Sequence, residues 1–253
     1  MCLILIAHHA HRGFPLVVGA NRDEFYSRPT APAEFWPDAP EVLAGRDLQA
    51  SGTWLGITRG LRFAAVTNFR DAQRMQAGAR SRGALTSEFL RGTMPAEPYL
   101  ESVSRSAADY SGFNLFVADA TGLFYFSNRD GEVRRLDPGI YGLSNHLLDT
   151  PWPKVSELKP RFDAAIREPL DPDSIRHILA DRGVAPDAAL PDTGVGLERE
   201  RLLSAAFVVS DAYGTRSTTA LSVGADRMVR FNEWSFGPAG KLIGQTAFTF
   251  TAG

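Results

Sequence analysis

The order of short apolar runs and tight turns constrains this 253-residue chain more than any other feature. Residues 2–10 and 14–20 are apolar runs of β character, and the turn signal Arg12-Gly13 between them predicts a hairpin. Neighbouring strands are joined by tight turns and do not alternate with helices, which favours an α+β fold with helices in separate layers over a doubly wound sheet. Further strand pairs are expected at 52–57 with 62–69 and at 112–119 with 123–127.

The remaining segments are predicted from the same signals. Four prolines in residues 27–50 indicate an ordered surface excursion, and the polar residues 71–83 indicate a mobile loop over a site. No repeat or credible linker interrupts the chain, which predicts one domain over residues 1–253. Helices are expected at 84–92, 95–110 and 154–182, a loop at 187–198, and strands at 139–145, 205–210, 218–223, 227–232 and 247–251.

Composition excludes several classes of function. Hydrophobic content of 44% and charged content of 22% are those of a globular protein, and a net charge of −2 gives no reason to expect a nucleic acid partner. A single cysteine excludes an intramolecular disulfide framework and any multi-cysteine metal site. The apolar run from Leu3 to Ala7 is too short for an integral membrane segment and lacks a basic region before it, so we expect a cytoplasmic protein.

The only cysteine, Cys2, directly follows Met1. Methionine aminopeptidases remove an initiator methionine before a small side chain, which would leave Cys2 with a thiol and a free α-amine. Because a thiol has a pKa of about 8.5 and an α-amine about 7.7 to 8.0, the amine can take the thiol proton near neutral pH. The alternative is an ordinary small residue at the start of a strand.

Four polar residues, Asn21 to Glu24, directly follow the second apolar run. In a hairpin, the end of the second strand returns beside the start of the first, so these residues are expected near Cys2. Asp23 could then hold the α-amine, and Arg22 could lower the thiol pKa or bind a substrate carboxylate. A charged turn with an internal ion pair is the favoured interpretation of Glu24 and an open alternative for Arg22.

Histidines gather near the first turn. On a regular strand His9 and His11 share a face, while His8 points the other way. Two imidazoles on one face could bind a metal or a haem iron, but a polar hairpin end is the favoured interpretation.

Taken together, the motifs closely resemble those of the NRDE family, also called the transport and Golgi organisation protein 2 family. The resemblance covers nearly the whole chain. It rests on Met1-Cys2, Asn21-Arg22-Asp23-Glu24, Gly52-Thr53-Trp54-Leu55-Gly56, Thr67-Asn68-Phe69-Arg70, Ser81-Arg82-Gly83, Gly112-Phe113-Asn114-Leu115, Leu143-Ser144-Asn145 and Tyr213-Gly214-Thr215-Arg216-Ser217.

This resemblance implies a branch of the N-terminal nucleophile hydrolases, whose fold is a four-layer αββα sandwich of two antiparallel sheets flanked by helices. More remotely, short motifs resemble the cysteine amidases that cleave bile-salt and penicillin amides. Arg22 is only an approximate counterpart of the amidase arginine near the aspartate. The catalytic residues that match those enzymes are Cys2, Asp23, Asn68, Asn145 and Arg216.

The implied mechanism is acyl transfer to Cys2 followed by hydrolysis, with Asp23 orienting the amine. The Asn145 side chain and the Asn68 backbone N–H would donate to the oxyanion, at roughly 3 to 4 kcal/mol per donor. Arg216 would keep the thiol deprotonated or grip an anionic substrate. Taken singly, both asparagines are also explained as turn formers at strand ends, and Asn114 is expected to be a buried hydrogen-bonding residue.

Two functions of different classes follow. The first is an amidase or thioesterase that acts on a small acyl compound and requires no cofactor or metal. The second is a carrier that binds haem or an acyl-CoA without chemistry, since the family resemblance also implies haem handling. Its possible iron ligands are His8, His9, His11, His146 and Cys2.

Overall fold

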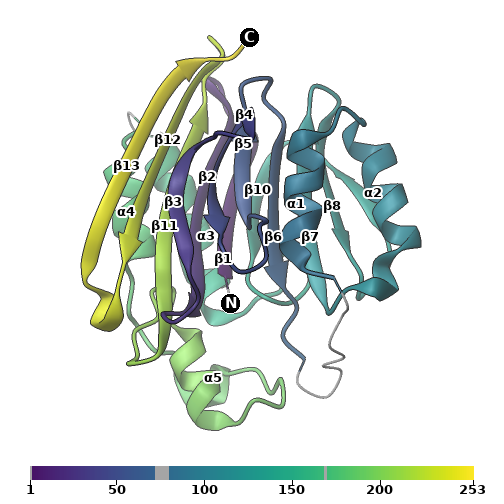
Figure 1. The fold of residues 1–253 in the computed structure, drawn as a ribbon. Coiled ribbons are helices and arrows are strands. Elements are labelled where there is room, and N and C mark those ends of the chain that lie inside the picture. The colour runs from purple at the N-terminus through teal and green to yellow at the C-terminus, as the bar shows by residue number, and fades with distance from the viewer. Residues whose placement is uncertain (1, 72–79, 168–169) are drawn as a thin grey trace. The chain divides into compact units, whose positions relative to one another are not determined.

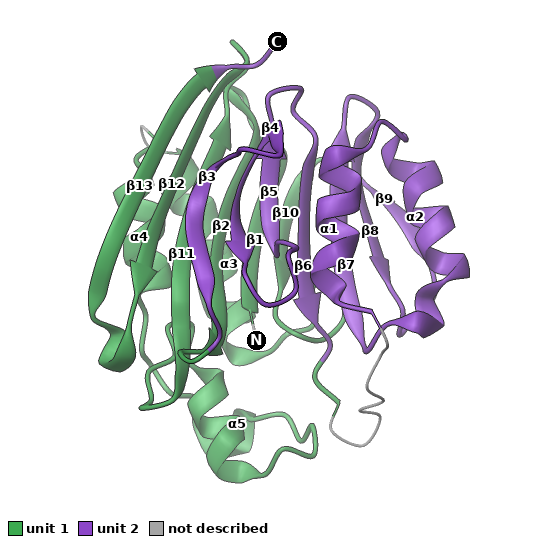
Figure 2. Ribbon diagram, in the orientation of Figure 1, with its two compact units in different colours: residues 1–27, 70–73, 138–250 green, residues 28–69, 74–137, 251–253 purple. Residues whose placement is uncertain are grey.

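The computed structural model describes residues 2–71, 80–167 and 170–253, which divide into two compact units (Figure 2). Each unit is assembled from segments that are far apart in the sequence, and one domain over the whole chain stays a prediction. Unit 1 comprises residues 1–27, 70–73 and 138–250, and unit 2 comprises residues 28–69, 74–137 and 251–253.

Unit 1 contains a six-stranded sheet in which the predicted hairpin of the first two strands is confirmed (Figure 1). The second strand also pairs antiparallel with a strand near the end of the chain. The sheet order is β10 (Gly139–Leu143), β1 (Cys2–His11), β2 (Phe14–Phe25), β11 (Tyr213–Val223), β12 (Met228–Phe236) and β13 (Leu242–Thr251).

Two helices of unit 1, α3 (Pro153–Arg167) and α4 (Pro172–Leu179), cover one face of this sheet. Leu3 and Leu5 alternate along β1 and join the helical side chains in one buried cluster. Gly19 lets α4 lie close to β2, because a Cβ at this position would come within 2.8 Å of Ile175 Cγ2. A third helix, α5 (Leu197–Ser204), follows where the sequence predicts only a loop up to residue 198.

Unit 2 contains a seven-stranded sheet whose strands follow one another in sequence order. The prediction of a surface excursion over residues 27–50 is wrong, since this stretch forms the β3–β4 hairpin. Pro32 is tolerated in β3 because this is an edge strand, where a missing N–H leaves no partner unsatisfied. The strands are β3 (Thr30–Trp36), β4 (Ala39–Asp47), β5 (Leu55–Thr58), β6 (Phe63–Asn68), β7 (Phe113–Asp119), β8 (Gly122–Ser127) and β9 (Val133–Leu136).

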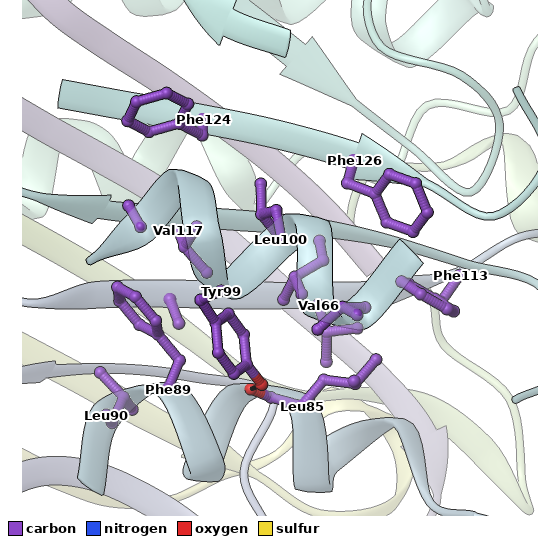
Figure 3. Close-up of a cluster of buried hydrophobic side chains, with 14 of the residues drawn as sticks. Val66, Leu85, Phe89, Leu90, Tyr99, Leu100, Phe113, Val117, Phe124 and Phe126 are labelled. Atoms are coloured by element: carbon purple, nitrogen blue, oxygen red, sulfur yellow. Dashed lines mark hydrogen bonds between the residues drawn. The ribbon is translucent and has the colours of Figure 1, made fainter. Parts of the chain in front are cut away.

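Two helices of unit 2, α1 (Arg82–Arg91) and α2 (Ala96–Arg105), pack on its sheet through an aromatic and aliphatic cluster (Figure 3). Tyr99 from α2 packs against Phe89 from α1 with ring centroids 5.1 Å apart, and its hydroxyl donates to Leu85 O at 2.5 Å. The tyrosine is thereby satisfied inside an otherwise apolar core.

The α+β class is confirmed, and each unit supplies one sheet and one helical layer, which together are the four layers that an αββα sandwich contains. The strand predicted at 205–210 is wrong, because only an isolated bridge from Val209 to Gly214 forms there. Most of the loop predicted over 71–83 lies outside the described residues. None of the helices in the described part of the chain is both long and apolar enough to cross a membrane.

Candidate active site

Cys2 is the first residue of β1 and pairs with Arg22 of β2. Its side chain is buried, with 7% of the residue exposed. Burial raises the pKa of the Cys2 thiol, while the charges of the N-terminus and of Arg22 lower it. Because burial is the larger effect, the resting sulfur is a protonated thiol at neutral pH and needs a base before it can act as a nucleophile.

Strand alternation places the polar side chains of the site on two faces of the sheet. Cys2 and Arg22 are paired, so their side chains share one face. Leu3 and Asn21, the next pair, point to the opposite face, where Leu3 packs under the helices. Asp23 follows Asn21 by two residues and therefore lies on the helix-covered face.

Asn145, which comes shortly after β10, contacts the nitrogen of Cys2. The Cys2 N–H donates to Asn145 Oδ1 at 3.1 Å. Asn145 adopts a left-handed backbone conformation with φ 58°, and its carbonyl accepts from the Arg70 N–H at 2.7 Å. Asparagine tolerates this conformation better than most residues. The carboxamide oxygen of Asn145 is thus the hydrogen-bond acceptor for Cys2. Donation to an oxyanion by its carboxamide nitrogen stays a prediction.

Asp23 is buried, with 2% of the residue exposed, and is held by a partner from β11. The Thr215 hydroxyl donates to Asp23 Oδ1 at 2.7 Å, and the Tyr213 hydroxyl donates to the Asp23 carbonyl at 3.1 Å. Burial raises the pKa of the Asp23 carboxyl, against the opposing influence of the charged N-terminus, Lys154 and Thr215. The carboxyl is thus oriented by one hydroxyl and needs nearby positive charge to stay ionised.

Asn21, the first residue of the tetrapeptide, has a structural role. Its Nδ2 donates to Leu179 O and to Ala206 O, each at 2.8 Å, and its Oδ1 accepts from the Thr218 hydroxyl at 2.6 Å. These bonds connect β2 to the end of α4 and to the segment before β11. The tetrapeptide therefore combines a structural residue with residues that lie close to Cys2.

Lys154 is a buried neighbour of the site that sequence reasoning missed. It lies in the first turn of α3, with 5% of the residue exposed, and its Nζ donates to Leu203 O at 2.9 Å and to Ala205 O at 3.2 Å. Burial lowers its pKa to about 8, and the charges of Asp23 and Cys2 act in the opposite direction. The sequence signal was weak: a lysine directly after Pro153 at a predicted helix start.

A β-bulge places Arg216 beside the site. Thr215 pairs with Asp23 and Ser217 pairs with Arg22, so Arg216 is the extra residue of β11. Its Nη1 donates to Phe25 O at 2.8 Å. Burial lowers the Arg216 pKa, as does the nearby Arg22 guanidinium. The guanidinium of Arg216 thus lies close to that of Arg22, the residue that pairs with Cys2.

Arg22 forms part of the internal ion pair that the sequence left open. Its Nη2 lies 3.8 Å from Glu24 Oε2, and the Arg22 side chain is only 11% exposed. The Glu24 carboxylate also accepts from the Phe25 N–H at 2.9 Å. The interpretation of Glu24 as an ion-pair partner is therefore confirmed, and a catalytic role of Arg22 stays a prediction.

A buried ion pair that the sequence analysis did not predict lies next to Asn145. Arg70 Nη1 is 3.3 Å from Glu200 Oε2 of α5, and both side chains are at most 5% exposed. The Arg70 guanidinium stacks on the Trp152 ring at 4.3 Å. Since the Arg70 N–H binds the Asn145 carbonyl, this pair fixes the backbone that presents Asn145 to Cys2.

Asn68 and Asn114, which the sequence motifs also contain, lie in unit 2. Asn68 ends β6 and pairs with Phe113, and its part in an oxyanion hole stays a prediction. Asn114 is fully buried, donates to the Thr67 hydroxyl at 3.1 Å and accepts from the Tyr125 hydroxyl at 2.7 Å. The expectation that Asn114 is a buried hydrogen-bonding residue is confirmed.

The histidines of the first turn lie at the end of β1 opposite Cys2. The regular alternation predicted for them is wrong, because the strand register shifts between His8 and His11 and His9 has a φ of 47°. His8 and His9 lie edge to face at 4.6 Å, and His11 Nδ1 accepts from the Gly13 N–H at 3.0 Å.

His146 lies at the Cys2 end of the unit, directly after Asn145. Its Nδ1 is 2.9 Å from the Thr150 hydroxyl, and its ring packs on Trp152 at 5.5 Å. Burial lowers the His146 pKa, as does the Arg70 charge. Within the described ranges, no three His, Cys, Asp or Glu side chains converge as a metal site would require.

The sequence is similar to one family of proteins over nearly its whole length. The family model described as Transport and Golgi organisation 2 matches residues 1–238. The Transport and Golgi organization protein 2 homolog of Bos taurus is 37% identical over 93% of both chains, and that of Homo sapiens is 38% identical over the same shares. Among solved structures, a Caenorhabditis elegans N-acylethanolamine-hydrolyzing acid amidase ortholog aligns with a TM-score of 0.48 at 12% identity, covering 87% of this chain and 92% of its own.

Proposed function

The chain belongs to the Transport and Golgi organisation 2 family, and we propose that it hydrolyses an amide or thioester of a small acyl compound through an acyl group on Cys2. The observation that carries the proposal is that the nitrogen of residue 2 is held beside a buried thiol. The nitrogen donates to Asn145 Oδ1 at 3.1 Å, and Cys2 is only 7% exposed.

The first half of the reaction forms the acyl-enzyme. After removal of Met1, the α-amine of Cys2 takes the thiol proton, and the thiolate attacks the substrate carbonyl. The tetrahedral oxyanion collapses to a thioester on Cys2, and the ammonium returns its proton to the departing amine or thiol. Asn145 and Asp23 orient the amine, while Asn145 and Asn68 are the proposed oxyanion donors.

The second half regenerates the enzyme. The free α-amine takes a proton from water, the hydroxide attacks the thioester, and the released Cys2 sulfur recovers that proton as the carboxylic acid leaves. Arg22 pairs with Cys2 and Arg216 lies beside Arg22, and we expect these two cations to favour a substrate with a carboxylate or another anion. This chemistry requires no cofactor or metal.

The first experiment is the intact mass of the native-start protein, before and after reaction with p-nitrophenyl acetate. We expect the loss of Met1, one acetyl adduct on Cys2, and slow recovery of the unmodified mass. Cys2→Ala is the matched variant, since alanine fits the same buried position. It should lose the adduct completely while unfolding at the same urea concentration.

A second control separates the thiol from the amine. In a chain extended by Met-Lys before Cys2, the thiol remains but its nitrogen is a peptide amide without basicity. We expect this chain to show no recovery after acetylation. Retained Met1 with an inert thiol, or equal turnover by the extended chain, would contradict an N-terminal nucleophile.

The alternative function is a carrier of haem or acyl-CoA. His8 and His9 lie at the end of β1 opposite Cys2, so a single haem iron would use ligands from one end only. Titration with haemin tests this, and a saturable spectral shift that Cys2→Ala or His8→Ala removes would support it. A cytoplasmic location stays a prediction.

A further inference from the structure

Lys154 occupies a position that disfavours a positive charge. It lies in the first turn of α3, where the helix dipole repels cations, and only 5% of it is exposed. Of the 27 basic residues in the chain only three are lysines, yet a lysine fills this position. Lysine differs from arginine in that its charge can be lost on burial, so retention of the charge here requires an anion nearby.

The direct acceptors of Lys154 do not supply that anion. Leu203 O and Ala205 O accept hydrogen bonds from two of the three N–H groups of the ammonium, and both are neutral carbonyls. The third proton has no acceptor among the residues that the structure describes. Burying an ammonium in this way is unfavourable unless a carboxylate compensates the charge.

Asp23 is the carboxylate on the same face of the sheet. The segment that accepts from Lys154 at Ala205 continues to Val208, whose N–H donates to the Thr215 hydroxyl oxygen at 2.9 Å. That hydroxyl in turn donates to Asp23 Oδ1 at 2.7 Å. One short segment therefore connects the surroundings of the ammonium to those of the carboxyl.

We propose that Lys154 is a positioning residue that acts through Asp23: its ammonium keeps the Asp23 carboxyl ionised, so that the carboxylate can hold the α-amine of Cys2. This role rests on the proposed function. When the amine takes the thiol proton it becomes an ammonium, which a neutral carboxylic acid would not stabilise. The lowered Lys154 pKa of about 8 still leaves the side chain mostly charged at neutral pH.

Other charged groups also face this pair and must be considered in its titration. Arg70 lowers the pKa of Lys154, and the Cys2 thiolate raises it. The charge of the N-terminus lowers the pKa of Asp23 more than Lys154 does, and Arg22 lowers it less. Arg22 and the Cys2 thiol do not replace Lys154 on the helix-covered face, because they lie on the other face of the sheet.

The small number of lysines makes a direct test possible. Lysine labelled with ¹³C at Cε gives signals for Lys154, Lys159 and Lys241, and Lys154→Arg identifies the buried one. In Asp23→Asn, which preserves shape, we expect the Lys154 titration midpoint to fall by about 1 to 3 pH units, the usual influence of an adjacent opposite charge. Lys159 and Lys241 are internal controls and should not move.

The reverse measurement uses ¹³Cγ of aspartate in Lys154→Met. We expect the Asp23 midpoint to rise by about 1 to 3 pH units, and the rate of acetylation of Cys2 by p-nitrophenyl acetate at pH 7 to fall at least about tenfold, with recovery in Lys154→Arg. Lysine titrations unaffected by Asp23→Asn would overturn the proposal even if Lys154→Met failed to fold.

The outcomes separate this proposal from the proposed function. A shifted midpoint with unchanged acetylation in Lys154→Met would overturn the positioning role and leave Lys154 as a structural ion-pair partner. Wild-type protein that is not acetylated at all would instead overturn the proposed function, whatever the titrations show. Coupled titrations together with slowed acetylation support the role of Lys154.

Discussion

Units 1 and 2 each combine an antiparallel sheet with helices on one face, yet they bury side chains of different charge. In the part of the chain that the structure describes, all five buried charged residues belong to unit 1: Asp23, Arg70, Lys154, Glu200 and Glu233. The buried polar residues of unit 2 are neutral: Thr53, Thr58, Thr67, Thr86, Ser87, Asn114 and Ser127.

Buried neutral groups and buried charges place different demands on the surrounding structure. A buried neutral group is satisfied by one or two hydrogen bonds, as in the Thr67–Asn114–Tyr125 chain of unit 2. A buried charge carries a large desolvation penalty and is retained where it is paired or functional. Four of the charges of unit 1 lie near Cys2 or Asn145, so the predictions below test whether sensitivity to buried charge is confined to unit 1.

The largest effect on stability is expected from the buried pair of unit 1. Arg70→Met leaves the Glu200 carboxylate buried without its cation, which should lower the free energy of unfolding by about 3–5 kcal/mol. Urea unfolding measures it. Adding Glu200→Gln should recover part of the loss, and a double variant as unstable as the sum of the single ones would show that the two charges are not coupled.

In unit 2, truncation of the aromatic core should be costly without affecting the chemistry. Phe89→Ala removes a fully buried ring that packs on Tyr99, and should lower the free energy of unfolding by about 3 to 4 kcal/mol. Phe162→Ala is the matched change in unit 1. Acetylation of Cys2 should be unchanged in Phe89→Ala at a temperature where the variant is folded; a loss of reactivity would break the contrast between the units.

The free energy of unfolding should change with pH because Lys154 titrates at different pH values in the folded and unfolded chain. Its pKa is about 8 in the folded chain, below the ordinary value of 10.5. Between these values the unfolded chain binds more protons, so folding becomes more favourable as pH rises, by about 3 kcal/mol in total, and below pH 8 this gain is absent. The difference in unfolding free energy between wild type and Lys154→Met should follow this curve; a flat difference would contradict it.

The smallest effect is expected from the neutral hydrogen-bond chain of unit 2. Tyr125→Phe removes the donor to Asn114 Oδ1 and should cost about 1–2 kcal/mol. Because the interaction is a neutral hydrogen bond, urea midpoints measured at pH 6 and pH 9 should fall equally. A loss that grows with pH would mean that unit 2 also depends on buried charge.

Local patterns were sufficient to predict part of the site. The apolar runs and the turn at Gly13 predict the β1–β2 hairpin, and the hairpin alone brings Asp23 back to Cys2, because antiparallel strands return to their starting point. The same local reasoning failed for residues 27–50, since four prolines outweighed the strand signal. The edge position of β3, which tolerates Pro32, is a property of the sheet.

The sequence by itself therefore determined the position of Cys2 and its hairpin neighbours, because these depend on contacts between residues close in the chain. Only the tertiary structure decided the rest. The contact of Asn145 with Cys2 spans 143 residues, the bulge at Arg216 arises where β11 pairs with β2, and Lys154 reaches the surroundings of Asp23 because α3 packs on that face. Such neighbours follow from the order of strands and the packing of helices, which no local pattern encodes.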